Sequence, residues 1–156
     1  MTLDNLNKAN ALVELAKDSK IAVVVSPYYL EISRNLISGA MKVISDSNIA
    51  SEIIEVDGAL EIPGAISLAQ KHFEGFVALG CVIRGETSHF EIVSQNSAQG
   101  LMKLSTQGLC IGNGIITVEN VQQALKRSDP NDKDKGGDAA RAVIGLMLLR
   151  KKYHTT

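Results

Sequence analysis

The segment Arg84-Gly-Glu-Thr-Ser-His89 holds the residues of this 156-residue chain that are best suited to chemistry. It follows an apolar run and precedes an amphipathic one, so it should open a helix, where unpaired amides and the helix dipole favour an anion. Gly85 would let a ligand approach the backbone, and Thr87 offers a hydroxyl. His89 could give and take a proton at neutral pH. The segment is either a phosphate site with an acid–base residue or an ordinary capped helix with a surface histidine.

Two further turns carry candidate binding residues. Glu61 lies in Gly58-Ala-Leu-Glu-Ile-Pro63 between apolar neighbours, where its carboxylate could accept hydrogen bonds from substrate hydroxyls or cap the following helix. Tyr28 and Tyr29 are two of only six aromatic residues, and both follow an apolar run. They could stack on a flat heterocycle or pack in the core.

Dinucleotides, ATP and metals have little support in the sequence. Gly112-Asn-Gly114 resembles the start of a dinucleotide-binding fingerprint but lacks its third glycine, and no Walker sequence is present. The histidines and cysteines lack the spacing of metal ligands. We therefore expect neither a cofactor nor a metal. Arg127 and Lys135 flank a polar loop, and taken alone they indicate solvated charges.

Composition excludes several classes of protein. Lys plus Arg (16) nearly balances Asp plus Glu (17), which argues against a nucleic-acid binder with a basic face. The first ten residues are polar, and no apolar stretch approaches the ~20 residues that span a bilayer. Cys81 and Cys110 lie in apolar runs, which indicates buried, reduced thiols. We expect a cytoplasmic protein that contacts neither nucleic acid nor membrane.

Short β-branched runs alternate with amphipathic stretches along the chain. Apolar runs predict strands over residues 21–25, 51–56, 76–83 and 109–116. Spacings of three and four predict helices over 5–17, 30–46, 63–72, 118–127 and 138–151, with another from about His89. Ser88 and Glu91 have capping-box spacing, and Thr117 is a candidate cap for the helix over 118–127.

This alternation predicts one α/β domain over residues 1–156, with a helical extension at 1–20 and a parallel sheet covered by helices on both faces. Ligands of such sheets bind beyond the carboxyl ends of the strands. That rule points to the segments 26–29, 57–61 and 84–89 and to the region around Asn113.

Taken together, these segments resemble the lumazine synthase family over residues 21 to 150. The core Val82-Ile-Arg-Gly-x-Thr-x-His89 is the distinctive match. The other matching stretches are Leu36-Ile-Ser-Gly-Ala40, Gly58-Ala-Leu-Glu-Ile-Pro63, Gly114-Ile-Ile-Thr117, Gln123-Ala124 and Lys135-Gly136.

The resemblance implies a flavodoxin-like α/β/α fold with a four-stranded parallel sheet. It also implies condensation of 5-amino-6-(D-ribitylamino)uracil with 3,4-dihydroxy-2-butanone 4-phosphate to 6,7-dimethyl-8-ribityllumazine, a step of riboflavin biosynthesis that needs no cofactor. His89 then takes the acid–base position and Tyr28 stacks on the pyrimidine. The remaining matched positions are Ala59, Leu60 and Glu61 for the ribityl chain, Cys81, Val82 and Ile83 for the pyrimidine edge, and Gly85, Glu86 and Thr87 for the phosphate.

The family builds its site between adjacent subunits of a homo-oligomer, so the resemblance assigns Asn113, Arg127 and Lys135 to a neighbour. Leu60 stands where the family commonly has phenylalanine, and Asn113 where it usually has an aromatic residue. The helical N-terminus replaces a strand of the shell-forming relatives, which favours a plain pentamer over an icosahedral shell. The alternatives are a flavin- or lumazine-binding protein with weak or no catalysis, or a scaffold role in assembly.

Overall fold

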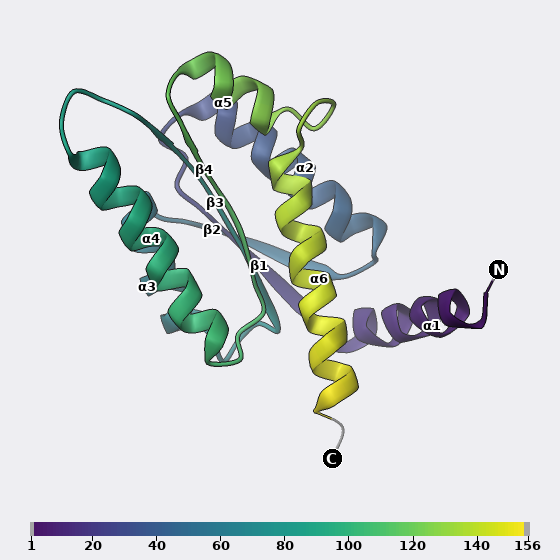
Figure 1. The fold of residues 1–156 in the computed structure, drawn as a ribbon. Coiled ribbons are helices and arrows are strands. Elements are labelled where there is room, and N and C mark those ends of the chain that lie inside the picture. The colour runs from purple at the N-terminus through teal and green to yellow at the C-terminus, as the bar shows by residue number, and fades with distance from the viewer. Residues whose placement is uncertain (1, 155–156) are drawn as a thin grey trace.

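The computed structural model describes residues 2–154, and its centre is a parallel sheet of order β2-β1-β3-β4 (Figure 1). The elements in chain order are α1 (Leu3–Asp18), β1 (Lys20–Val25), α2 (Leu30–Asp46), β2 (Ala50–Glu55), the 3-10 helix η1 (Ala59–Glu61), α3 (Ile62–Ala69), β3 (Gly75–Ile83), α4 (His89–Thr106), β4 (Ile111–Val118), α5 (Val121–Ser128) and α6 (Lys135–Tyr153).

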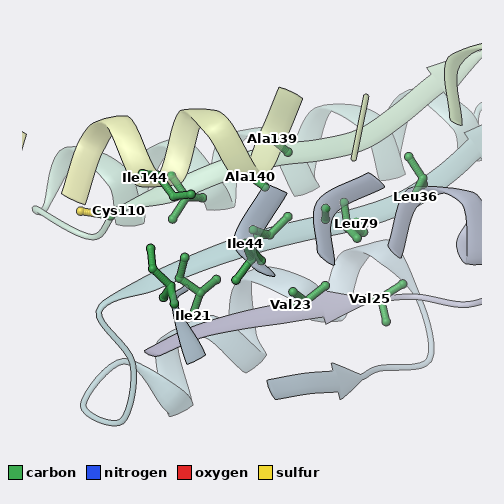
Figure 2. Packing of buried hydrophobic residues seen from close by; sticks show 14 of the residues in the cluster. Ile21, Val23, Val25, Leu36, Ile44, Leu79, Cys110, Ala139, Ala140 and Ile144 are labelled. Atoms are coloured by element: carbon green, nitrogen blue, oxygen red, sulfur yellow. The ribbon is translucent and has the colours of Figure 1, made fainter. Parts of the chain in front are cut away.

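The inner strands are apolar because both of their faces are covered. Residues 21–25 of β1 are fully buried, and alternate side chains enter two different cores. Ile21, Val23 and Val25 pack against α2 and α6 (Figure 2), whereas Ala22 and Val24 face α3 and α4. Helices α2, α5 and α6 thus cover one face and α3 and α4 the other (Figure 1). The predicted three-layer α/β fold is confirmed.

The helix predictions are correct where the apolar spacing is long and regular. The helix over 30–46 is observed as α2, and the helix over 5–17 as α1. The predicted cap at Thr117 is wrong, because Thr117 pairs with Val82 inside β4. Asn120 caps α5 instead, and its side chain accepts a hydrogen bond from the Gln123 amide.

The last helix begins three residues earlier than predicted. Asp134 adopts a left-handed conformation (φ 45°), and its carboxylate accepts a hydrogen bond from the Gly137 amide at 3.1 Å. The first turn of α6 lies directly against α2. A Cβ atom on Gly136 would stand 2.1 Å from the Leu36 carbonyl oxygen, so only glycine permits this approach. The close contact between α6 and α2 therefore depends on Gly136, which lies outside the apolar stripe of α6.

Among the helices of residues 2–154, none is long and apolar enough to cross a membrane. The same residues contain no group of three or more His, Cys, Asp or Glu side chains placed to hold a metal ion.

Gly136→Ala should destabilise the protein by about 1–3 kcal/mol, since the added methyl group meets backbone that cannot rotate away. Denaturant unfolding measures the loss. Gly145→Ala, on the same helix with open space around the position, is the matched control and should be neutral or stabilising by up to about 1 kcal/mol. Equal stability of the two variants would contradict the packing argument.

Candidate active site

A cavity of about 470 Å³ opens where the pairing between β1 and β3 ends. Strand β1 pairs with β3 only as far as Leu79, where the Ser26 amide donates the last hydrogen bond to the Leu79 carbonyl. Strand β4 stays paired with β3 through Ile83. The β1 side of residues 81–83 is therefore open to a ligand. This crevice is the position at which open α/β sheets bind small molecules.

Eight of the predicted site residues line this cavity: Tyr28, Ala59, Leu60, Glu61, Cys81, Val82, Ile83 and His89. Five more residues line the cavity: Ser26, Tyr29, Asp57, Gly58 and Val93; of these, the sequence named only Tyr29 as a candidate, for stacking on a ligand or packing in the core. All but Val93 lie within the turns that the carboxyl-end rule indicated. Val93 belongs to the apolar stripe of α4, so its type alone gave no signal of a site.

Two tyrosines form one wall of the cavity. The Tyr28 and Tyr29 rings meet edge to face, with their centroids 5.0 Å apart. Tyr28 is 76% exposed, so its ring has an open face for a flat ligand. Tyr29 is half-buried, and burial together with the nearby Cys81 and Tyr28 raises the pKa of its phenol. Tyr29 therefore stays protonated and packs, while Tyr28 is available.

The turn between β2 and α3 supplies the acidic wall. The Ser26 hydroxyl donates to the Asp57 carbonyl at 3.2 Å, which fixes the turn to the end of β1. Glu61 precedes α3 but makes no capping hydrogen bond with its side chain. A Cβ atom on Gly58 would stand 2.7 Å from Glu61 Oε2, so the missing side chain leaves room for this carboxylate. Of the two roles open to Glu61, the geometry favours ligand binding.

Helix α4 begins at His89, as predicted, but the capping box is wrong. Ser88 makes no side-chain capping hydrogen bond, since its backbone (φ −69°, ψ 2°) is not extended as in a capping residue, and the Glu91 carboxylate pairs with Arg84 instead of reaching back to residue 88. The Thr87 hydroxyl oxygen accepts from the His89 amide at 3.3 Å. Within the described residues, the amides of Gly85, Glu86 and Thr87 donate to no protein acceptor. They remain available to a ligand at the positive end of α4.

The other predicted residues lie apart from the cavity. Gly85, Glu86 and Thr87 form the exposed turn that follows β3, beyond the cavity's own lining. Asn113 is not at the carboxyl end of its strand: it lies near the amino end of β4, where it pairs with Ala78 of β3. It faces a second groove between α4 and β4, where its side-chain oxygen Oδ1 accepts a hydrogen bond from the Ile115 amide at 2.9 Å.

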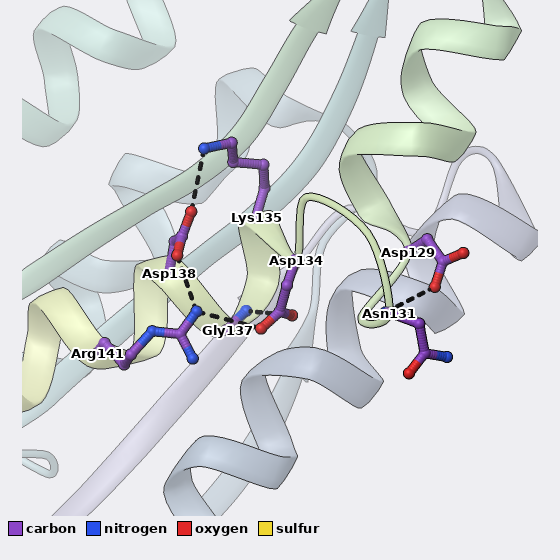
Figure 3. A network of polar contacts seen from close by, with 7 residues as sticks. All are labelled: Asp129, Asn131, Asp134, Lys135, Gly137, Asp138 and Arg141. Atoms are coloured by element: carbon purple, nitrogen blue, oxygen red, sulfur yellow. Dashed lines mark hydrogen bonds and ion pairs between the residues drawn. The ribbon is translucent and has the colours of Figure 1, made fainter.

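The two cations that the resemblance assigns to a neighbouring subunit, Arg127 and Lys135, differ in their surroundings. Lys135 is held by Asp138 at 3.0 Å, in a network that also joins Arg141 to Asp138 and Asp134 (Figure 3). Arg127 has no ion-pair partner among residues 2–154, and its guanidinium reaches only the Gln123 carbonyl at 3.5 Å. Neither lines the cavity of its own chain. Arg127 is the cation with the freer charge.

The sequence profile of the 6,7-dimethyl-8-ribityllumazine synthase family matches residues 18–151. The protein of that name from Novosphingobium aromaticivorans is 49% identical over 137 residues, which cover 86% of this chain and 99% of the relative. Its counterpart from Zymomonas mobilis is 52% identical over 136 residues, covering 86% and 98% respectively. The chain belongs to this family. All fourteen predicted site residues lie within the match, whereas almost all of α1 precedes it.

The cysteines in this member of the family differ in burial, which corrects the expectation that both are buried. Both are free thiols; Cys110 is buried, but Cys81 is only half-buried and lines the cavity. Desolvation raises the pKa of the Cys81 thiol to about 11. Cys81 is therefore a neutral, weakly nucleophilic wall of the cavity rather than a reactive thiolate.

Alkylation of Cys81 by iodoacetamide should rise about tenfold per pH unit from pH 8 to 10, because the thiolate fraction of a high-pKa thiol grows in that proportion. Peptide mass spectrometry separates Cys81 from the buried Cys110, which serves as the internal control. An ordinary pKa near 9 would make the rate level off between pH 9 and 10, and a lowered pKa would make it level off nearer pH 8; either result would contradict this expectation.

Proposed function

We propose that this protein condenses 5-amino-6-(D-ribitylamino)uracil with 3,4-dihydroxy-2-butanone 4-phosphate to give 6,7-dimethyl-8-ribityllumazine, inorganic phosphate and water. The observation that carries the proposal is the family match across residues 18–151, with His89 among the residues that line the cavity. The comparisons give no support to the alternative of a binding protein without turnover.

The pyrimidine substrate suits the cavity between β1 and β3. Tyr28 would stack on its ring, and the open backbone edge of residues 81–83 would hydrogen-bond its polar edge. The ribityl chain would lie along Ala59, Leu60 and Glu61, where the carboxylate accepts from hydroxyl groups. Two carboxylates, those of Asp57 and Glu61, make this cavity suitable for a neutral polyol and unsuitable for a phosphate.

The phosphorylated substrate would bind outside the cavity, at the turn that opens α4. The amides of Gly85, Glu86 and Thr87 supply donors there, and Arg127 supplies a fixed cation. Because Arg127, Lys135 and Asn113 do not line the cavity of their own chain, we propose that an adjacent subunit supplies them within a homopentamer. The free charge of Arg127 supports this arrangement.

The chemistry asks little beyond positioning and proton transfer. The 5-amino group attacks the ketone and the adduct loses water to form an imine. Phosphate is then eliminated, and attack of the ribitylamino nitrogen on the carbonyl that elimination unmasks closes the ring with loss of a second water. Holding both substrates together supplies much of the rate gain. His89 would move the protons from the first turn of α4, next to the proposed phosphate position.

His89→Ala should slow turnover by roughly ten- to ten-thousand-fold, the range of lost acid–base catalysis. Lumazine formation followed by absorbance, against the uncatalysed background, gives the rate. His72→Ala is the matched control and should keep wild-type turnover, since His72 is exposed beyond the end of α3 and lines no part of the cavity. Undiminished turnover in His89→Ala would refute the assignment of the acid–base residue.

Arg127→Ala should raise the KM for the phosphorylated substrate, since that substrate alone carries the charge that Arg127 would meet. Steady-state kinetics with each substrate varied in turn measures the change. Lys126→Ala, an exposed cation on the same helix, is the control and should leave both KM values unchanged. A rise confined to the KM of the pyrimidine would show that the phosphate role is wrongly assigned.

A further inference from the structure

Arg84 makes three side-chain contacts that neither the pocket nor the family motif explains. Its Nε donates to Glu119 at 2.8 Å, its guanidinium pairs with Glu91, and its Cζ lies 4.2 Å from the centre of the Phe90 ring. Its backbone amide donates to the Val118 carbonyl at 2.9 Å. Both the backbone and the side chain of this one residue are therefore fixed.

Through these contacts, Arg84 connects the two ends of the turn formed by residues 85–88. The backbone of Arg84 anchors the start of the turn to the β3–β4 ladder. Its side chain grips Phe90 and Glu91 in the first turn of α4, just beyond the end of the turn. Glu119 joins the same guanidinium to the β4–α5 connection, where the Glu119 amide donates to the Gln123 side chain. The turn and His89 thus lie between the end of the β3–β4 ladder and the first turn of α4, and Arg84 contacts both.

Arg84 is poorly placed to bind phosphate directly. Two carboxylates already neutralise its charge, and their hydrogen bonds raise the pKa of the guanidinium further. An incoming anion would have to displace both of them. A lysine would not reproduce the arrangement, because only the planar fork of arginine pairs with two carboxylates while stacking on a ring.

We propose that Arg84 is a positioning residue for the phosphorylated substrate: by holding both ends of the turn 85–88, it sets the anion-binding amides and His89 in place. This inference rests on the proposed function, since it deepens the role of the same turn. Arg84 is absent from the lining of the cavity where the pyrimidine would bind. Its loss should therefore raise the KM of the phosphorylated substrate and, by displacing His89, lower kcat, while the KM of the pyrimidine changes little.

Steady-state kinetics of Arg84→Met with each substrate varied tests this split. The KM of the phosphorylated substrate should rise about tenfold or more, while the KM of the pyrimidine stays within about twofold. Arg84→Lys should share the defect, because lysine keeps the positive charge but cannot pair with two carboxylates and stack on Phe90 at the same time. Glu119→Gln, which leaves Arg84 in place, should show a smaller rise in the same KM.

Lys20→Met is the matched control. Lys20 also pairs with a carboxylate, that of Glu52 at 2.8 Å, and lies over the Phe73 ring, but it starts β1 at the amino end of the sheet. Both KM values should stay unchanged in this variant. The ion pairs of Arg84 and Lys20 are partly exposed and add little to stability, so both proteins should fold and melt within a few degrees of wild type.

Hydrogen exchange of the ligand-free proteins separates this inference from the proposed function. The hydrogen-bonded amides at the start of α4, those of His89 and Ile92, should exchange faster in Arg84→Met than in wild type or Lys20→Met, with no change in α6. Unchanged exchange in that segment, or equal rises of both KM values in an active enzyme, would overturn the inference. A wild-type protein that forms no lumazine would overturn the proposed function instead.

Discussion

The parting of β1 from β3 after Leu79 is the constraint on which the site depends. Up to that residue β3 is paired on both sides, and beyond it only β4 continues, as far as Ile83. The last residues of β3 therefore have one side in the sheet and one side in the crevice. The same strand then runs directly into the turn 84–88. The proposed pyrimidine and phosphate positions are thus consecutive segments of a single rigid element.

The two proposed substrate positions differ in their electrostatic environment. Asp57 and Glu61 make the cavity acidic, Cys81 and Tyr29 stay protonated, and neither a lysine nor an arginine is among its lining residues to attract a phosphate. The turn after β3 carries free amides at a helix start, which is the opposite environment. Arg84 would hold this turn in shape, but its charge is neutralised by Glu91 and Glu119. A further cation is needed, and Arg127, which has no ion-pair partner among residues 2–154, is the candidate.

Long local patterns in the sequence predicted most of the fold. The apolar spacing from Leu30 to Asp46 matches α2, because that stripe faces one continuous core. Predictions from short cap motifs failed, since they ignore partners distant in sequence. Glu91 has capping spacing, yet Arg84 takes its carboxylate. Thr117 is a good cap by type, yet strand pairing with Val82 extends β4 through it.

The carboxyl-end rule located the cavity, because parallel strands end at one edge whatever their sequence. It could not assign residues that a second chain would supply, since spacing along one chain carries no information about a neighbour. The rule wrongly included the region around Asn113, and Arg127 and Lys135 became site candidates only through the family resemblance; in this chain all three lie outside the cavity. The assembly that would bring them to it stays a proposal.

Mixing two defective subunits tests the central claim, that each site is shared between neighbouring chains. His89→Ala subunits keep Arg127, and Arg127→Ala subunits keep His89, so random co-assembly in equal amounts places both intact residues in about a quarter of the sites. Assayed at a low concentration of the phosphorylated substrate, the mixed assembly should recover about a quarter of wild-type activity. Activity no greater than the mean of the two separate variants would show that one chain supplies both residues, and would contradict the account.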